Sequence, residues 1–336
     1  ALAAARSSSP IHTFSMRVEG PGFDEGDAAS ETAAVIGSTH HTASFGPGDL
    51  AALLHEITGS LDEPLADSSL LPTWKLMASV REAGFKCVQS GDGADESFAG
   101  YPTHLAHRLA SAATPARSLL RRITAALPTT EGGVSTDYMA RRFVDGLGLP
   151  WQRRHQVWMG AWLPQDVDAD EAVWSEVDAH AEAVQGADSV SQALYLDQRM
   201  YLSDGVLTKV DRAAGAHGIE VRSPYMDHTI VELAAQMGTG HKLRGTANKR
   251  VLRAALADLL PDNTLDRKKK GFGAPVGPWL RGPCTYLLDG LAERVDQWIP
   301  GDTVRTCIAA HRDGQTDERR RLWSALILAH WAEGPW

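Results

Sequence analysis

The chain has 336 residues, of which 43% are hydrophobic and 22% charged, and its formal net charge is −9. This is the composition of a globular protein with one large domain or two average ones. No apolar run approaches the ~18 residues of a membrane span, and the acidic balance argues against a nucleic-acid-binding surface. We therefore expect no membrane and no nucleic-acid partner. The three cysteines, Cys87, Cys284 and Cys307, are too few for a disulfide framework and lack metal-binding spacing, which favours a reducing, cytoplasmic location.

The first hundred residues alternate between strand and helix patterns. Residues 11–18 alternate apolar and polar side chains, as a half-buried strand does. Further strands are expected at 40–45 and 85–90, and helices at 25–37, from Asp49 as N-cap to Ile57, and at 72–83. Strands that alternate with helices predict a parallel sheet.

After Tyr101 the pattern becomes helical and strand signals nearly vanish. Helices are predicted at 106–126, 169–185, 190–202, 228–237, 249–260 and 319–332, with a polar loop at 129–135. We therefore predict an α/β fold in which residues 1–104 form the sheet part and residues 105–336 a mainly helical part that packs on it. The opening run, Ala1 to Arg6, resembles the end of a helix, so we expect the chain to begin inside a structural unit.

The segment richest in candidate chemistry is Ser90 to Tyr101, which follows a predicted strand. Its residues 90–96, here called the acidic turn, hold two glycines that let backbone approach a ligand, and three carboxylates, those of Asp92, Asp95 and Glu96. In open parallel sheets, ligands bind beyond the carboxyl ends of the strands. So many anions near a phosphate imply an intervening cation, Mg²⁺. We expect the three carboxylates to line one cleft, although carboxylates that only cap the following helix are the alternative.

Two further charged segments allow both a structural and a functional interpretation. Between residues 204 and 227, charges alternate with apolar residues, which favours a structural ion-pair network for Glu220, Arg222 and Asp227. Lys209 and Arg212 are candidates to face an anionic ligand instead.

The other segment, residues 267–275, carries four consecutive cations among glycines and a proline. It is either a solvated surface run or a mobile loop that neutralises developing phosphate charge. The pair His40-His41 is a poor metal candidate, because neighbouring residues of a strand point to opposite faces.

Several motifs, in order along the chain, resemble the synthetase domain of glutamine-dependent asparagine synthetases, which belong to the PP-loop group of ATP pyrophosphatases. Gly37 to His41 is similar to "LGTxHH", residues 61–72 to "DEP…D.S..P", and residues 90–101 to "SGDGxDExFxGY". Residues 207–227 are similar to "LxKVDRxxMxxxxEVRxPxLD", 242–253 to "KLRGxxxKxxLR", and 267–275 to "RxKxGFxxP". The resemblance implies a Rossmann-like parallel sheet of the adenine nucleotide alpha hydrolase type with a large helical C-terminal half.

Some features of the family have no counterpart in these residues. The nucleotide loop "SGGxDSS" with the strand before it, and the glutaminase domain with its N-terminal cysteine, are not found, and Ala213-Ala214-Gly215 replaces the usual small-Ser-Met. In related folds that strand is central in the sheet. We therefore expect the strands at 11–18 and 85–90 to be separated by a gap or by another segment.

The resemblance also implies roles for individual residues. Met16, Ser90, Gly91 and Gly93 would hold adenosine, the last three through the backbone of the turn. Asp95 would bind Mg²⁺ together with pyrophosphate.

Three further residues are implied in catalysis. Asp92 would take part in proton transfer when the amine attacks. Lys269 and Arg212 would neutralise phosphate charge.

The reaction that the resemblance implies has two steps. A carboxylate attacks the α-phosphate of ATP to give an acyl-adenylate and pyrophosphate, and an amine then displaces AMP. The implied cofactors are ATP and Mg²⁺. The implied partners are a small carboxylate, above all aspartate, ammonia from a glutaminase domain, and a second copy of the chain in a homodimer.

Alternatives remain open at this point. β-Lactam synthetases and lasso-peptide cyclases activate a carboxylate in the same way but use an internal amine. The former tend to have tyrosine where this chain has Asp92. An alternative of another class is that the chain is an inactive fragment or one part of a split enzyme.

Overall fold

The strands of the computed structural model form two parallel pairs. The structure describes residues 1–336 except 21–23, 129–135, 168–169, 261, 266–272 and 335–336. Strand β1 (His12–Val18) pairs with β2 (Thr39–Phe45), in a register that runs from His12 opposite Thr39 to Val18 opposite Phe45. Strand β3 (Cys87–Gln89) pairs with β4 (Glu220–Arg222). The three predicted strands are therefore confirmed.

Strand β4 lies in the part of the chain where strand signals nearly vanish, and the sequence did not predict it. Three residues are too few to show a period. Among the described residues the four strands form two separate two-stranded parallel sheets, and the Rossmann-like sheet stays a prediction. As expected, the strands at 11–18 and 85–90 do not pair with each other.

The described part of the first hundred residues also carries helices. These are α1 (Leu2–Arg6), α2 (Gly26–Ile36), α3 (Pro47–Thr58), α4 (Leu70–Glu82) and α5 (Ala94–Phe98). Helices α2 and α4 both contact the β1–β2 pair. The prediction of Asp49 as N-cap was wrong by three residues: Gly46 is the N-cap, and the Asp49 carboxylate accepts the Gly46 N–H at 2.8 Å. Pro47 starts the helix earlier, because its fixed φ suits a first helical position.

In the rest of the described chain the regular elements are helices, apart from β4. Its elements are α6 (Pro102–Ala113), η1 (Thr114–Ala116), α7 (Arg117–Ala125), α8 (Thr136–Gly146), α9 (Trp151–Met159), η2 (Pro164–Asp166), η3 (Glu171–Trp174), α10 (Ser175–Ala183), α11 (Ser189–Leu196), η4 (Asp197–Leu207), α12 (Thr208–Ala216), η5 (Pro224–Met226), α13 (His228–Gln236), α14 (Thr239–Lys242), α15 (Arg250–Leu256), α16 (Asp262–Leu265), α17 (Val276–Arg281), η6 (Thr285–Leu288), α18 (Leu291–Val295), α19 (Gly301–Arg312) and α20 (Arg319–Ala332). The helix predicted over 106–126 is interrupted near Pro115 by η1. The polar loop predicted at 129–135 lies outside the described residues.

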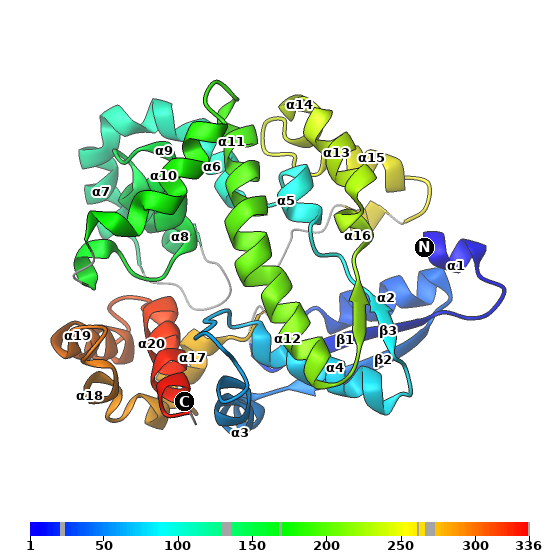
Figure 1. Ribbon diagram of the computed structural model, residues 1–336, viewed down its shortest axis with the longest axis horizontal. Helices are drawn as coiled ribbons and strands as arrows, with labels where there is room; N and C mark the ends of the chain where they lie inside the picture. Colours follow the sequence, from blue (N-terminus) through cyan, green and yellow to red (C-terminus); the bar gives the residue numbers. More distant parts are fainter. Residues whose placement is uncertain (21–23, 129–135, 168–169, 261, 266–272, 335–336) are drawn as a thin grey trace.

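One long helical run crosses the middle of the molecule. Figure 1 shows α11, η4 and α12 as a continuous ribbon between the other helices, and its middle section η4 is π-helical. Stretches of π-helix are rare and occur often near functional sites. No described helix has both the length and the apolar character needed to span a membrane.

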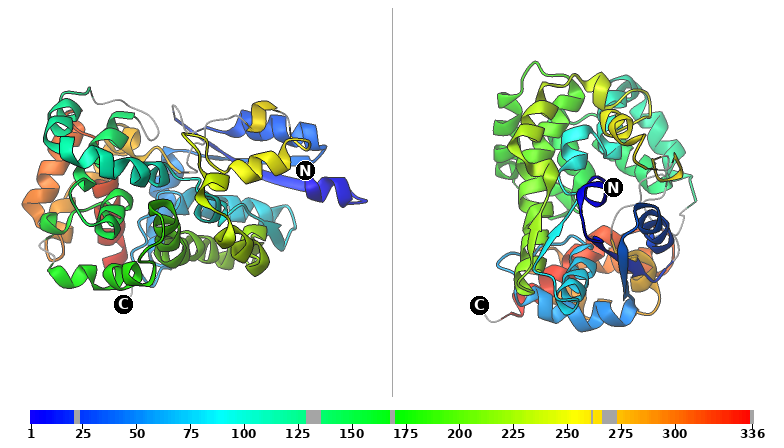
Figure 2. Two further views of the ribbon diagram at one scale, coloured as in Figure 1. Left: turned by 90° about the horizontal axis from the view of Figure 1, so that it is seen from above. Right: turned by 90° about the vertical axis from the view of Figure 1, so that its right-hand side faces the viewer.

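The main hydrophobic core joins segments that are far apart in sequence. It combines residues of β1, β2, α3 and α4 with residues of α17 to α20. The rings of Phe45 and Trp279 lie 5.7 Å apart, and Trp331 Nε1 donates to the Leu61 carbonyl at 3.0 Å. A smaller core lies between α6, α8 and α9. The C-terminal helices thus complete the core of the α/β part. Figure 2 shows the ribbon from two further directions, with these helices in orange and red.

A second interior feature is a buried cluster of three histidines around Asp197. The Asp197 carboxylate lies 2.7 Å from His104 Nε2 and 3.0 Å from His155 Nε2, and His155 Nδ1 lies 3.0 Å from His107 Nε2. All four side chains are buried. Burial by itself would raise the pKa of Asp197, but His155 and His104 outweigh it and hold this pKa well below its usual range. Burial, and then the neighbouring His155, lower the pKa of His107.

The histidine cluster makes stability depend on pH. The pKa of His107 in the folded protein lies below its unfolded value of about 6.5. Below about pH 6.5, therefore, His107 binds a proton in the unfolded chain before it does so in the folded protein. Stability is therefore fully present above about pH 6.5 and falls below it, by up to about 1.4 kcal/mol per pH unit for this group. We expect His107→Gln to flatten this slope in urea unfolding at pH 7.5, 6.5 and 5.5. The exposed His228, changed to Gln, is the control, and an unaltered slope in His107→Gln would contradict the assignment.

Candidate active site

The acidic turn lies at the carboxyl end of a parallel strand, as predicted. It follows β3 directly, and the segment after β4 holds it in place. The Ser90 N–H donates to the Arg222 carbonyl at 3.0 Å, and the Ser223 hydroxyl donates to the Asp92 carbonyl. The β3–β4 pairing thus brings together two of the motifs that carry the family resemblance.

Gly93 is the residue that lets the two segments approach. Its φ is +86°, in the left-handed region that favours glycine. A Cβ at this position would lie 2.6 Å from Met226 Sδ and 3.5 Å from the Tyr225 carbonyl oxygen. Both the backbone conformation and the lack of space therefore require glycine here.

Asp95 forms an ion pair with Lys249, a residue for which the sequence suggested no role. Lys249 Nζ lies 2.8 Å from Asp95 Oδ1. The only hint of this contact was that Lys249 stands in a motif shared with the family, residues 242–253. Gly100 makes room for the pair, because a Cβ there would lie 1.6 Å from Asp95 Oδ1.

The expectation that three carboxylates line one cleft was wrong for Glu96. Its side chain is buried and accepts a hydrogen bond from the Tyr101 hydroxyl at 2.5 Å. Burial raises the pKa of Glu96. The backbone carbonyl of Glu96 accepts from Gln198 Nε2 at 3.2 Å. Glu96 thus anchors the acidic turn to the helical part, while Asp92 and Asp95 remain partly exposed.

The residues implied in adenosine binding come from both strand pairs. Gly91 is exposed and Ser90 is half-buried at the start of the turn. Met16 lies on β1, opposite Ala43, and its side chain is buried in the main core. The adenosine role of these residues stays a prediction.

Arg212 and Lys209 both lie on α12 and have carboxylate partners in the segment before α4. Arg212 Nη2 lies 2.7 Å from Asp62 Oδ2 in an exposed pair. Lys209 Nζ is buried, 3.0 Å from Asp67 and 2.8 Å from Ser69 Oγ. Lys209 thus joins two elements of the fold, whereas Arg212 forms exposed ion pairs with Asp62 and, at 3.9 Å, with Asp211, of a kind that contributes about 0–1 kcal/mol each.

The remaining candidates are placed as follows. Lys269 and its neighbours fall outside the described residues. His40 lies within 3.0 Å of the hydroxyls of Thr13 and Ser15, whereas His41 Nε2 lies 2.9 Å from His12, so the two histidines point to opposite faces as predicted. In the described part of the chain, no three His, Cys, Asp or Glu side chains are grouped to bind a metal.

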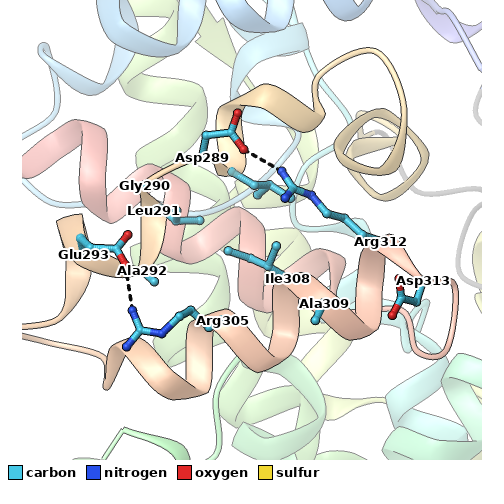
Figure 3. Close-up of a pocket in the computed structure, with 11 residues that line it drawn as sticks. Asp289, Gly290, Leu291, Ala292, Glu293, Arg305, Ile308, Ala309, Arg312 and Asp313 are labelled. Atoms are coloured by element: carbon cyan, nitrogen blue, oxygen red, sulfur yellow. Dashed lines mark hydrogen bonds and ion pairs between the residues drawn. The ribbon is translucent and has the colours of Figure 1, made fainter.

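A cavity of about 420 Å³ lies between residues 288–293 and α19 (Figure 3). Two ion pairs lie among its lining residues: Arg305 with Glu293 at 2.8 Å and Arg312 with Asp289 at 2.9 Å. A second hollow of about 340 Å³ lies between α2 and the face of β1 that carries Thr13. Neither cavity is lined by the acidic turn.

The fold and this site thus combine two features. A glycine-rich acidic turn lies at the end of a parallel strand, and a large helical part follows it in the chain. The asparagine synthase family model matches residues 1–333, and the chain belongs to this family.

The curated relatives agree with this assignment. The chain is 30% identical over 343 residues to a Mycobacterium tuberculosis protein described as "Putative asparagine synthetase", with 98% of this chain and 52% of that protein covered. It is 25% identical over 337 residues to glutamine-hydrolyzing asparagine synthetase 1 of Bacillus subtilis, with 96% and 52% covered. It is also 22% identical over 307 residues to the amidase chry2 of Gibberella zeae, with 83% and 45% covered. The chain thus spans about half the length of these relatives.

The requirement for glycine in the turn is testable with a matched pair of substitutions. We expect Gly93→Ala to lower the free energy of unfolding by about 1–3 kcal/mol, because it adds a strained φ and a collision with Met226. Gly91→Ala, two residues away, meets no atom within 4 Å and is expected to be nearly neutral. Urea unfolding of both variants is the measurement. Equal stabilities would show that neither the positive φ nor Met226 requires glycine at position 93.

Proposed function

We propose that this chain is the synthetase unit of an enzyme that forms an amide bond through an acyl-adenylate, at the expense of ATP. The observation that carries the proposal is the β3–β4 pairing, which sets the acidic turn and Asp95 at the carboxyl end of a parallel strand. Family membership supports the reaction class. We further propose the adenine nucleotide alpha hydrolase type of fold, with the boundary between the sheet part and the helical part at residues 104/105.

The proposed chemistry divides among three residues of this chain. Asp92 is partly exposed at the turn, where it would accept a proton from the attacking amine. Arg212 would leave its exposed pair with Asp62 and contact pyrophosphate, at a small cost. Lys269 would neutralise charge on the α-phosphate during attack.

The described residues offer Mg²⁺ one carboxylate ligand, which fits the way proteins bind this ion. Mg²⁺ in such sites is held by one or two carboxylates, substrate phosphates and water. Asp95 offers one such carboxylate, and a cation, the Lys249 ammonium, already lies on its Oδ1. When bound, the ion would stabilise charge on the phosphate oxygens. Asp95 would hold it, and the backbone of Ser90, Gly91 and Gly93, together with Met16, would hold adenosine.

For the substrate we propose aspartate, with ammonia delivered by a glutaminase domain, as the names of the relatives suggest. The proposed setting is the cytoplasm, where the three free cysteines would stay reduced, and the proposed assembly is a homodimer. The proposal also implies that a further strand pairs along β1 and β3, because two-stranded sheets are marginal by themselves.

The proposed reaction is tested by carboxylate-dependent exchange of pyrophosphate into ATP in the full-length protein. We expect aspartate to stimulate this exchange and Asp95→Asn to lower its rate by roughly 10²–10³, the effect of losing one preorganised charge. Asp49→Asn, which breaks a lysine–aspartate pair with Lys75 elsewhere, is the control and should exchange normally. Exchange that ignores aspartate but responds to another carboxylate would reassign the substrate.

The lysine segment gives a separate prediction. Lys269→Ala should lower the adenylation rate by roughly 10²–10³ more than it weakens ATP affinity, because its charge acts in the transition state. Lys268→Ala and Lys270→Ala should have much smaller effects. The measurement is pyrophosphate release for each variant. Three equal losses would show that the segment acts only as an electrostatic patch.

A further inference from the structure

The contact between Asp95 and Lys249 is enclosed by its surroundings. The exposed fractions of the two side chains are 17% and 25%. Gly100 leaves the pair its space, since a Cβ there would also lie 2.4 Å from Lys249 Cε. The ion pair is therefore partly screened from water, where opposite charges attract more strongly than on an open surface.

The backbone on both sides of this contact is strained. Ala99 has φ +58° and Lys249 has φ +48°, and within the described ranges no other residue except glycine has a positive φ. The Lys249 N–H donates to the Phe98 carbonyl at 3.2 Å, and Asn248 Nδ2 donates to the Gly100 carbonyl at 3.0 Å. Strain of this kind persists where the surrounding structure holds it and is common at functional sites. Two segments about 150 residues apart are thus bonded so that the ammonium meets the carboxylate.

We propose that Lys249 is the built-in counter-ion of Asp95, and that it keeps a free divalent cation off this carboxylate until a nucleotide arrives. The inference rests on the proposed function. An ammonium 2.8 Å from Oδ1 neutralises the charge of the carboxylate and repels a second cation. The phosphates of a nucleotide supply both a new partner for the ammonium and oxygen ligands for the metal. Lys249 is in this sense a positioning residue that makes metal entry depend on nucleotide.

The test is a titration with Mn²⁺ alone, followed by electron paramagnetic resonance, on the full-length protein without nucleotide. We expect Lys249→Met to bind Mn²⁺ at least about tenfold more tightly than the wild type, the effect of removing a neighbouring positive charge. Adding Asp95→Asn to Lys249→Met should abolish the gain. Lys75→Met, which frees Asp49 from a comparable pair, should leave the affinity at the acidic turn unchanged.

A second arm tests the dependence on nucleotide. When Mn²⁺ is supplied as its ATP complex, the advantage of Lys249→Met should disappear or reverse. Equal affinity of wild type and variant for free Mn²⁺ overturns the proposal, and so does an advantage that persists with the ATP complex. Lys249→Gln serves if the Met variant does not fold. The first arm contains no nucleotide, so its failure is distinct from a failure of the exchange assay that tests the proposed function.

Discussion

The candidate site depends on the pairing of two strands of only three residues each. Strands β3 and β4 lie more than a hundred residues apart in sequence, and their parallel register places Ser90 beside Arg222 and Gly93 beneath Met226. Without that register the acidic turn would not pack against the segment after β4. The Asp92 carbonyl would also lose its hydrogen bond from the Ser223 hydroxyl. Such a short pair contributes few hydrogen bonds, so its stability comes from the elements packed around it.

Packing by distant helices supplies that stability. Val88 and Val221, the central residues of the two strands, both pack against the main core, which also contains side chains of α12 and of α17 to α20. The core is thus built from both ends of the chain. The buried Lys209, paired with Asp67, fixes α12 against the segment before α4. A change in the C-terminal helices would therefore reach the acidic turn through the core rather than through direct contact.

The charges around the turn are handled in two different ways. Glu96 faces the interior, where Tyr101 donates to it, and the Tyr101 N–H in turn donates to His104, a partner of Asp197. This buried polar chain anchors the turn to the helical part, since a polar group in the interior is costly without a partner. Asp95 faces the other way, toward Lys249, and retains some exposure. The two neighbouring carboxylates on this short helix thus have different environments: Glu96 is buried and hydrogen-bonded, and Asp95 is partly exposed and paired with a cation.

The sequence by itself determined the strands β1, β2 and β3, most helices, the family resemblance and the place of the acidic turn after a strand. These features rest on local periods and on contiguous motifs, which a single segment contains. Tertiary structure alone decided that residues 220–222 form a strand, that Glu96 turns inward and that Lys249 meets Asp95. Each of these depends on segments separated by about 100 to 150 residues, or on which face of a short helix is covered, and no local pattern carries that information. The role of Lys249 and the strand conformation of Glu220–Arg222 are decided only when folding brings their partners within hydrogen-bond distance.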